Sequence, residues 1–175
     1  MHNTNINQNS EDHGFFINPD VLTNCGVILK EANMMYFLLA NIFTVHESVH
    51  EPEKFEKMMK KDPLFMKHRK EEIRPKLMMN DYKTNMKKVR ECVFIADDFY
   101  TPIEKALKNS QYVIREMFVD IPKMKKLSDD PHCLDAYLED TIQTLTSVND
   151  CLFTMSDVLD RLLDGVDNWE KKKNG

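Results

Sequence analysis

The residues most able to do chemistry lie in the stretch HESVH, where His46, Glu47 and His50 form an H-E-x-x-H motif. Positions four apart on a helix share one face, so two imidazoles can reach one metal ion. A glutamate beside the first histidine then lies near a metal-bound water and can act as a general base. His46 and His50 are therefore candidate zinc ligands, and Glu47 is a candidate catalytic residue.

HESVH resembles the short motif of the zincin metallopeptidases, and the resemblance spans residues 46–50. It implies a zinc-binding protein or a metallopeptidase with a third protein ligand on a later helix. The sequence EPE follows the motif, so the Gly-x-x-His extension of some zincins is absent. Three acidic residues have the chemistry of a third ligand, although their spacing singles out none of them: Glu91, Asp97 and Asp98.

The helix that carries this motif offers a simpler interpretation of the two histidines. From Pro19 to His50, apolar residues recur at steps of three and four, which predicts a helix of about 30 residues. His46 continues the apolar stripe and His50 lies on the neighbouring row, so both fit the packing pattern without a metal. We therefore favour structural histidines, no cofactor and a non-catalytic protein, with zinc binding as the alternative.

Composition narrows the class of protein. The chain has 175 residues, of which 42% are hydrophobic and 30% charged, as expected of one soluble domain. Only four glycines occur, which argues against phosphate-binding loops. The net charge is −5, with positive charge gathered in residues 51–126 and negative charge in 127–175. Nucleic-acid binding is not expected, because no face is both strongly basic and rich in aromatic residues.

Periodicity predicts an all-α fold, an elongated antiparallel bundle of three long helices with short connecting helices at 53–73. The second long helix would cover 79–121 and cross Pro102, where we favour a kink over a turn that would make four helices. Pro131 starts the last long helix. The predicted domains are a flexible polar tail at 1–18, the bundle at 19–170 and a basic tail at 171–175.

The connecting segment carries an apolar set amid lysines, which we call the 55–66 patch: Phe55, Met58, Met59, Leu64, Phe65 and Met66. An amphipathic, lysine-rich segment of this kind can dock a partner protein or lie on a membrane surface. In a simpler interpretation its apolar face only closes the end of the bundle. The sequence leaves the oligomeric state open.

We therefore expect a non-catalytic bundle that acts through protein or membrane interaction, as an adaptor, an effector or a host-cell-interaction protein. The bias toward Asn, Lys, Met and Ile is typical of an AT-rich genome. In outline the chain resembles small secreted proteins that parasites such as malaria sporozoites use at host-cell membranes. That resemblance implies the alternative of a membrane-active secreted protein that perturbs or crosses host membranes.

Two features of the sequence bear on where the protein is located. The polar N-terminus contains no apolar signal segment, and four cysteines without a C-x-x-C motif favour reduced thiols. We expect a cytoplasmic protein if these residues are the whole chain. A secreted protein is expected if a signal peptide was trimmed from it.

Overall fold

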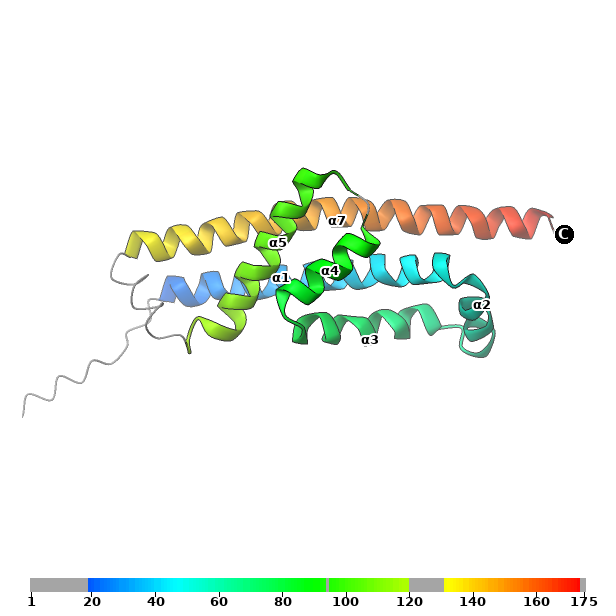
Figure 1. The fold of residues 1–175 in the computed structure, drawn as a ribbon, viewed down its shortest axis with the longest axis horizontal. Helices are drawn as coiled ribbons and strands as arrows, with labels where there is room; N and C mark the ends of the chain where they lie inside the picture. The colour runs from blue at the N-terminus through cyan, green and yellow to red at the C-terminus, as the bar shows by residue number, and fades with distance from the viewer. Residues whose placement is uncertain (1–18, 94, 120–130, 174–175) are drawn as a thin grey trace, which may run out of the picture.

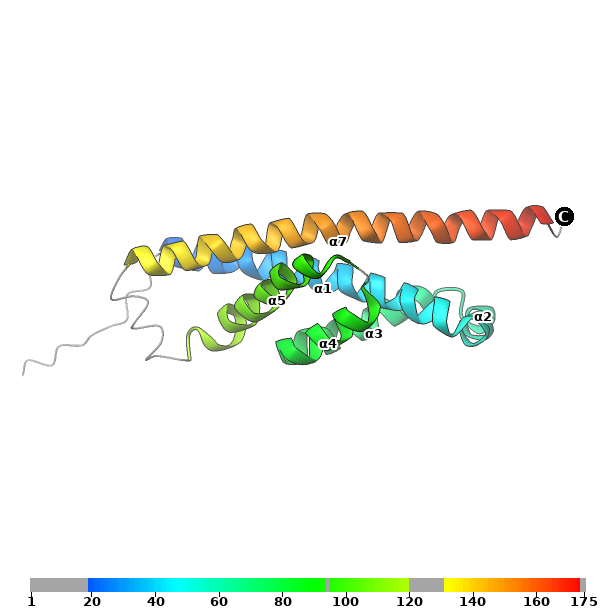
Figure 2. The ribbon, with the colours of Figure 1, turned by 45° about the horizontal axis from the view of Figure 1, so that its top comes forward.

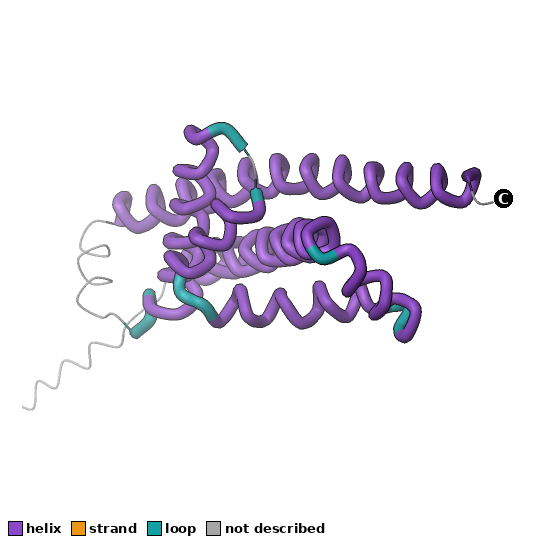
Figure 3. The backbone as a smooth tube through the Cα atoms, turned by 45° about the vertical axis from the view of Figure 1, so that its right-hand side comes forward, coloured by secondary structure: helices purple, strands orange, loops and turns teal. Residues whose placement is uncertain are grey.

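The computed structural model describes residues 19–93, 95–119 and 131–173, and Figure 3 shows that helices make up almost all of them. No strand occurs within these residues, so the prediction of an all-α fold is confirmed. The elements are α1 (Pro19–His50), α2 (Pro52–Lys61), α3 (Phe65–Met79), α4 (Tyr82–Cys92), α5 (Asp97–Gln111), the π-helical turn η1 (Tyr112–Glu116) and α7 (Pro131–Lys173).

α1 is the central helix of the bundle. Residues 38–45 are buried on every side of the helix, and α1 contacts α3, α4, α5 and α7. The main row of the predicted apolar stripe is buried from Ile28 to Ile42, whereas Leu22, Leu29 and Val49 are exposed. The helix ends at His50, as predicted, and Pro52 begins the next one.

α7 lies alongside α1 and runs in the same direction, as Figures 1 and 2 both show. Asn149 donates to the Glu31 carbonyl at 3.0 Å, and further along both helices Asn41 donates to the Ser156 hydroxyl. A parallel first and last helix is what an up-down-up bundle requires. α5 crosses both helices obliquely in Figure 1, and its Lys105 pairs with Asp140 of α7 at 2.7 Å.

The prediction of one long helix across Pro102 is wrong, and so is the alternative of a turn there. Pro102 lies inside α5, whereas the chain breaks after Met79 and again between Cys92 and Asp97. At the first break the Asp81 carboxylate accepts from the backbone N–H groups of Lys83 and Thr84, at 2.9 and 3.0 Å, which starts α4.

The second break puts Asp97 and Asp98 at the N-terminus of α5, where negative charge interacts favourably with the helix dipole. The Tyr100 hydroxyl donates to the Val93 carbonyl at 2.6 Å, which ties the two sides of the reversal together. Neither glycine nor proline marks this reversal in the sequence.

The two short connecting helices are confirmed as α2 and α3, separated around Pro63. α3 differs from the prediction in its length, because it continues through Pro75 to Met79. The predicted tail at 1–18 lies outside the described residues. So do residues 174–175 of the predicted tail at 171–175, while α7 itself extends to Lys173.

Candidate functional site

The two histidines of HESVH lie in the last turns of α1 with their rings stacked. The ring centroids of His46 and His50 are 3.9 Å apart and the ring planes differ by 25°. A metal bound by both rings must lie in both ring planes, and two nearly parallel stacked planes share no such nearby point. Joint ligation would therefore require at least one ring to change its rotamer.

Each histidine also has a structural contact. The Nδ1 atom of His50 lies 2.9 Å from the His46 carbonyl oxygen, one of the last carbonyls of the helix. A histidine in the last turn of a helix can make such a contact with a carbonyl near the helix end. Burial lowers the pKa of His46, and the neighbouring His50 lowers it further, so the neutral imidazole is favoured in the fold.

Glu47 forms ion pairs with Arg69 of α3 and Lys88 of α4, and Arg69 also pairs with Glu72 at 2.8 Å; we call this group the Glu47 cluster. Arg69 donates from Nε to Oε2 at 2.8 Å and from a second nitrogen to Oε1 at 3.2 Å, and Lys88 donates to Oε1 at 3.4 Å. The Glu47 and Arg69 side chains are only 24% and 27% exposed. Burial raises the pKa of Glu47, but the Arg69 hydrogen bonds and the two positive charges lower it below its ordinary value.

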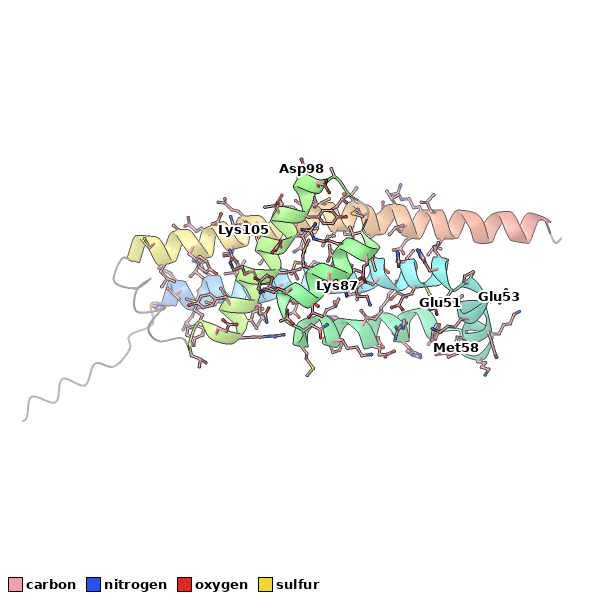
Figure 4. The ribbon with its side chains drawn as sticks, in the orientation of Figure 1. Glu51, Glu53, Met58, Lys87, Asp98 and Lys105 are labelled. Atoms are coloured by element: carbon pink, nitrogen blue, oxygen red, sulfur yellow. The ribbon has the colours of Figure 1, made fainter. Side chains whose placement is uncertain are left out.

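This arrangement opposes the role that the motif predicts for Glu47. A general base needs a pKa near the working pH and an accessible lone pair, and two cations hold this carboxylate ionised and engaged. Among the three candidate third ligands, Glu91 acts electrostatically on His46. Asp98 lies at the start of α5, away from Glu51 at the end of α1 (Figure 4). Within the described residues, no group of three or more His, Cys, Asp or Glu side chains is arranged to hold a metal ion.

The 55–66 patch divides into a buried part and an exposed part. Phe55 is 4% exposed and makes an edge-to-face contact with Phe65, with ring centroids 5.3 Å apart, so the two rings fasten α2 to α3. Met58, Met59 and Leu64 are 36%, 44% and 56% exposed. Figure 4 shows Met58 on the outward side of α2. The surface available to a partner is therefore smaller than the predicted patch and is centred on the methionines.

A pocket of about 590 Å³ opens beside the exposed part of the patch. Residues from α1, α2, α3 and α7 line it: Ser48, Pro52, Phe55, Glu56, Met59, Lys60, Met66 and Leu163. Phe55, Met59, Met66 and Leu163 form an apolar interior, and Lys60 and Glu56 stand at its edge with Nζ and Oε1 2.6 Å apart. Such a pocket suits one or two apolar side chains of a docked helix.

The charge around this pocket is mostly positive. Three lysines each pair with a nearby glutamate: Lys54 with Glu51, Lys60 with Glu56 and Lys67 with Glu71. Lys57, Lys61 and Lys70 have no ion pair with any residue that the structure describes, so their charges are open to a ligand. Sequence reasoning found the lysines and the methionines. It missed Leu163, because only the fold brings the end of α7 to α2.

A second hollow of about 310 Å³ lies between α1, the end of α4 and the second half of α7. It is lined by Ile42, Cys92, Thr154, Met155, Val158 and Leu159, and nearly all of its surface is apolar. α5 covers the first half of α7, through contacts such as Lys105 with Asp140, and leaves this part open. Sequence reasoning could not find this hollow. Its position depends on which part of α7 is covered by α5, and that in turn depends on the chain break after Cys92.

The cysteines of the described residues are free thiols. Cys25, Cys92 and Cys151 are free and partly buried, and burial raises the pKa of each thiol. A raised pKa lowers the fraction of reactive thiolate at neutral pH. These three thiols are therefore poor nucleophiles, whereas Cys133 near the start of α7 is exposed.

Comparison with known proteins leaves the function to be inferred from these side chains. The chain matches no protein-family model, no curated protein and no solved structure. None of the helices within the described residues combines the length and the apolar character that crossing a membrane requires.

Proposed function

We propose that this protein is a non-catalytic binding protein whose 55–66 patch docks an amphipathic, acidic helix of a partner protein. The observation that carries this proposal is the open apolar pocket beside Met59, in a segment where Lys57, Lys61 and Lys70 have no ion pair with any described residue. Methionine side chains adapt their shape to a partner, so a methionine-rich surface suits helix docking. The free lysines select a ligand of opposite charge and speed its association.

The Glu47 cluster supports the non-catalytic part of the proposal. Its carboxylate is the only candidate base in the motif, and Arg69 and Lys88 occupy both of its oxygens. Those contacts join α1 to α3 and α4, so the motif residue contributes to the position of the helices that carry the patch. Activation of a water molecule would require the loss of these contacts.

A membrane surface is the competing ligand, and the burial of Phe55 argues against it. Lysine-rich amphipathic helices bind lipid through large apolar side chains, with aromatic residues prominent among them. In α2 the aromatic residue faces the bundle, so only Met58, Met59 and the following Leu64 remain for a lipid surface. A membrane-active, secreted protein that uses this segment stays the second hypothesis.

The test is site-specific photocrosslinking in extract of the source cells. A photoreactive amino acid replaces Met58, the crosslinked protein is identified by mass spectrometry, and the purified partner is titrated against the chain. We expect Met59→Glu to weaken this binding at least tenfold, which corresponds to about 1.4 kcal/mol. The matched control Met79→Glu changes a methionine that is 79% exposed on the same helix pair, and should leave the affinity unchanged.

Two outcomes contradict the proposal. One is binding that Met59→Glu and Met79→Glu weaken equally, because the pocket would then play no special part. The other is cosedimentation of the chain with vesicles of anionic phospholipid that Met59→Glu abolishes, which would establish the membrane as the ligand of the patch.

A further inference from the structure

We infer that the acidic helix that docks on the 55–66 patch is the second half of α7 from a second copy of this chain, in a reciprocal two-fold dimer. The inference rests on the proposed function, because it names the occupant of the same patch. In such a dimer each copy supplies one α7 and one pocket. Both pockets are then occupied, and no docking surface is left free to recruit a third copy.

The second half of α7 has the properties that the patch requires of a ligand. It exposes three large apolar side chains, Phe153, Val158 and Leu162, at 64%, 49% and 61%. A single cation, Arg161, occurs between residues 150 and 170, and it pairs with Asp157 at 2.8 Å. The acidic residues in this span are Asp150, Asp157, Asp160, Asp164, Asp167 and Glu170. This half of α7 is therefore an amphipathic helix of strongly negative charge.

The charge of the patch is complementary. Between residues 54 and 70 the acidic side chains are Glu56 and Asp62, and the basic ones are Lys54, Lys57, Lys60, Lys61, Lys67, Arg69 and Lys70. Opposite net charges on two surfaces of one chain favour association between copies and raise its rate. Parallel packing of two acidic α7 helices is disfavoured for the same reason, because like charges would face each other.

The two surfaces lie at the same end of the molecule. In Figures 1 and 2 the C-terminal end of α7 and the helix α2 stand at one end of the long axis. Leu163 lines the pocket of its own chain. A two-fold axis at this end therefore brings the α7 of each copy to the patch of the other.

The docking cannot occur within one chain. Successive residues of a helix point about 100° apart, so Val158 and Leu162 face other sides of α7 than Leu163 does. While Leu163 faces the pocket of its own chain, these two side chains point away from it and stay exposed. A second copy can cover them, because its patch approaches from outside.

The experiment is sedimentation equilibrium of the full chain at concentrations up to about 100 µM, in about 0.05 M and 0.5 M salt. We expect a dimer at low salt whose dissociation constant rises at least tenfold at high salt, because screening weakens the opposed charges. Leu162→Glu and Met59→Glu should each weaken the dimer at least tenfold. The control Leu22→Glu, at a position 51% exposed at the start of α1, should have no effect.

Mixing two variants tests whether the two contacts of the dimer are reciprocal. When the Leu162→Glu and Met59→Glu variants are mixed, one of the two contacts in the mixed dimer is native and the other carries both substitutions. The mixed dimer should therefore be tighter than either variant dimer alone. Equal weakness of all three overturns the reciprocal arrangement.

A chain that is monomeric at every concentration and salt overturns the inference, and so does a dimer that Leu162→Glu leaves intact. Neither result overturns the proposed function by itself. A monomeric chain that still binds a purified partner through Met59 keeps the docking role and excludes the second copy as the ligand. Loss of both binding to a partner and dimer formation overturns the two together.

Discussion

Arg69 holds the Glu47 carboxylate through two hydrogen bonds, Nε to Oε2 at 2.8 Å and a second guanidinium nitrogen to Oε1 at 3.2 Å. The pair connects the end of α1 to α3, and both side chains are about three-quarters buried. A paired guanidinium and carboxylate in this geometry form one of the stronger ionic contacts that proteins make. The residue that the H-E-x-x-H motif offers as a base therefore stabilises the junction of two helices.

Glu47→Gln is expected to lower the free energy of unfolding by about 1–3 kcal/mol, because the largely buried Arg69 then loses one of its two carboxylate partners and keeps only Glu72, at 2.8 Å. Urea denaturation followed by circular dichroism measures the change. The matched control Glu53→Gln lies at an exposed position on α2 and should shift the free energy by less than about 0.5 kcal/mol. Equal shifts in the two variants would contradict the structural role of Glu47.

The contribution of Glu47 should depend on pH in a defined direction. Its folded-state pKa lies below the ordinary value of 4.5, so the ion pair contributes fully at pH values above 4.5. The contribution is lost as the pH falls through the lowered folded-state pKa. The difference in unfolding free energy between the wild type and Glu47→Gln should be constant from pH 7 to pH 5 and shrink in more acidic buffer. A difference in unfolding free energy that grows on acidification would show that folding raises the pKa of Glu47 instead of lowering it.

Zinc affinity should be insensitive to the two motif histidines. The rings of His46 and His50 are stacked, with His50 Nδ1 held at the His46 carbonyl, so they do not converge on one ion. Calorimetric titration of the tag-free chain with zinc should give the same curve for the wild type and for a His46→Ala/His50→Ala double variant. One zinc per chain that the double variant loses would revive the metal site and justify a search for its third ligand.

Asn41 and Ser156 should behave as a coupled pair between α1 and α7. Both are buried, and the Asn41 amide donates to the Ser156 hydroxyl, while its own Oδ1 lacks a partner among the described residues. Ser156→Ala alone removes one acceptor of the Asn41 amide, which still donates to the Asp160 carboxylate at 3.2 Å, and should cost about 1 kcal/mol. The double variant Asn41→Leu/Ser156→Ala removes both polar groups and should recover most of that loss. Additive losses in the double-mutant cycle would show that the two residues act independently.

Pro102→Ala is expected to raise the free energy of unfolding by about 1–3 kcal/mol. Pro102 is the sixth residue of α5 and cannot donate to the carbonyl of Asp98 one turn earlier, so alanine restores a helical hydrogen bond. Thermal and urea denaturation measure the gain. A loss of stability would mean that the chain needs proline at this position, as a turn at Pro102 would.

The outer helices could be predicted because their apolar residues recur without interruption and prolines mark their ends. The reversal between α4 and α5 could not be predicted, because the apolar residues that these two helices bury follow one continuous three-four spacing. The buried residues on both sides of the reversal keep the same helical spacing: Val89 and Val93 before it, and Ile103 and Leu107 after it. The break therefore shows only in tertiary contacts such as the bond from Tyr100 to Val93.

The candidate site shows the same limit. Sequence spacing found the 55–66 patch and the motif histidines, because both lie within one or two neighbouring helices. It could not pair Glu47 with Arg69 and Lys88, which lie on two other helices, and it could not bring Leu163 to the pocket. Contacts between residues far apart in the chain depend on how the helices pack, and the local spacing of residues does not reveal that packing.

The parallel course of α1 and α7 has a mechanical consequence. In Figure 1 the start of α1 and the end of α7 lie toward opposite ends of the long axis, and these helix ends are Pro19 and Lys173. Tension applied between these two residues therefore pulls α1 and α7 past each other lengthwise. The buried contacts along their shared length carry the load together, whereas a hairpin pulled at its open end separates one contact at a time. The bundle should resist stretching along its long axis better than an antiparallel helical pair of the same size.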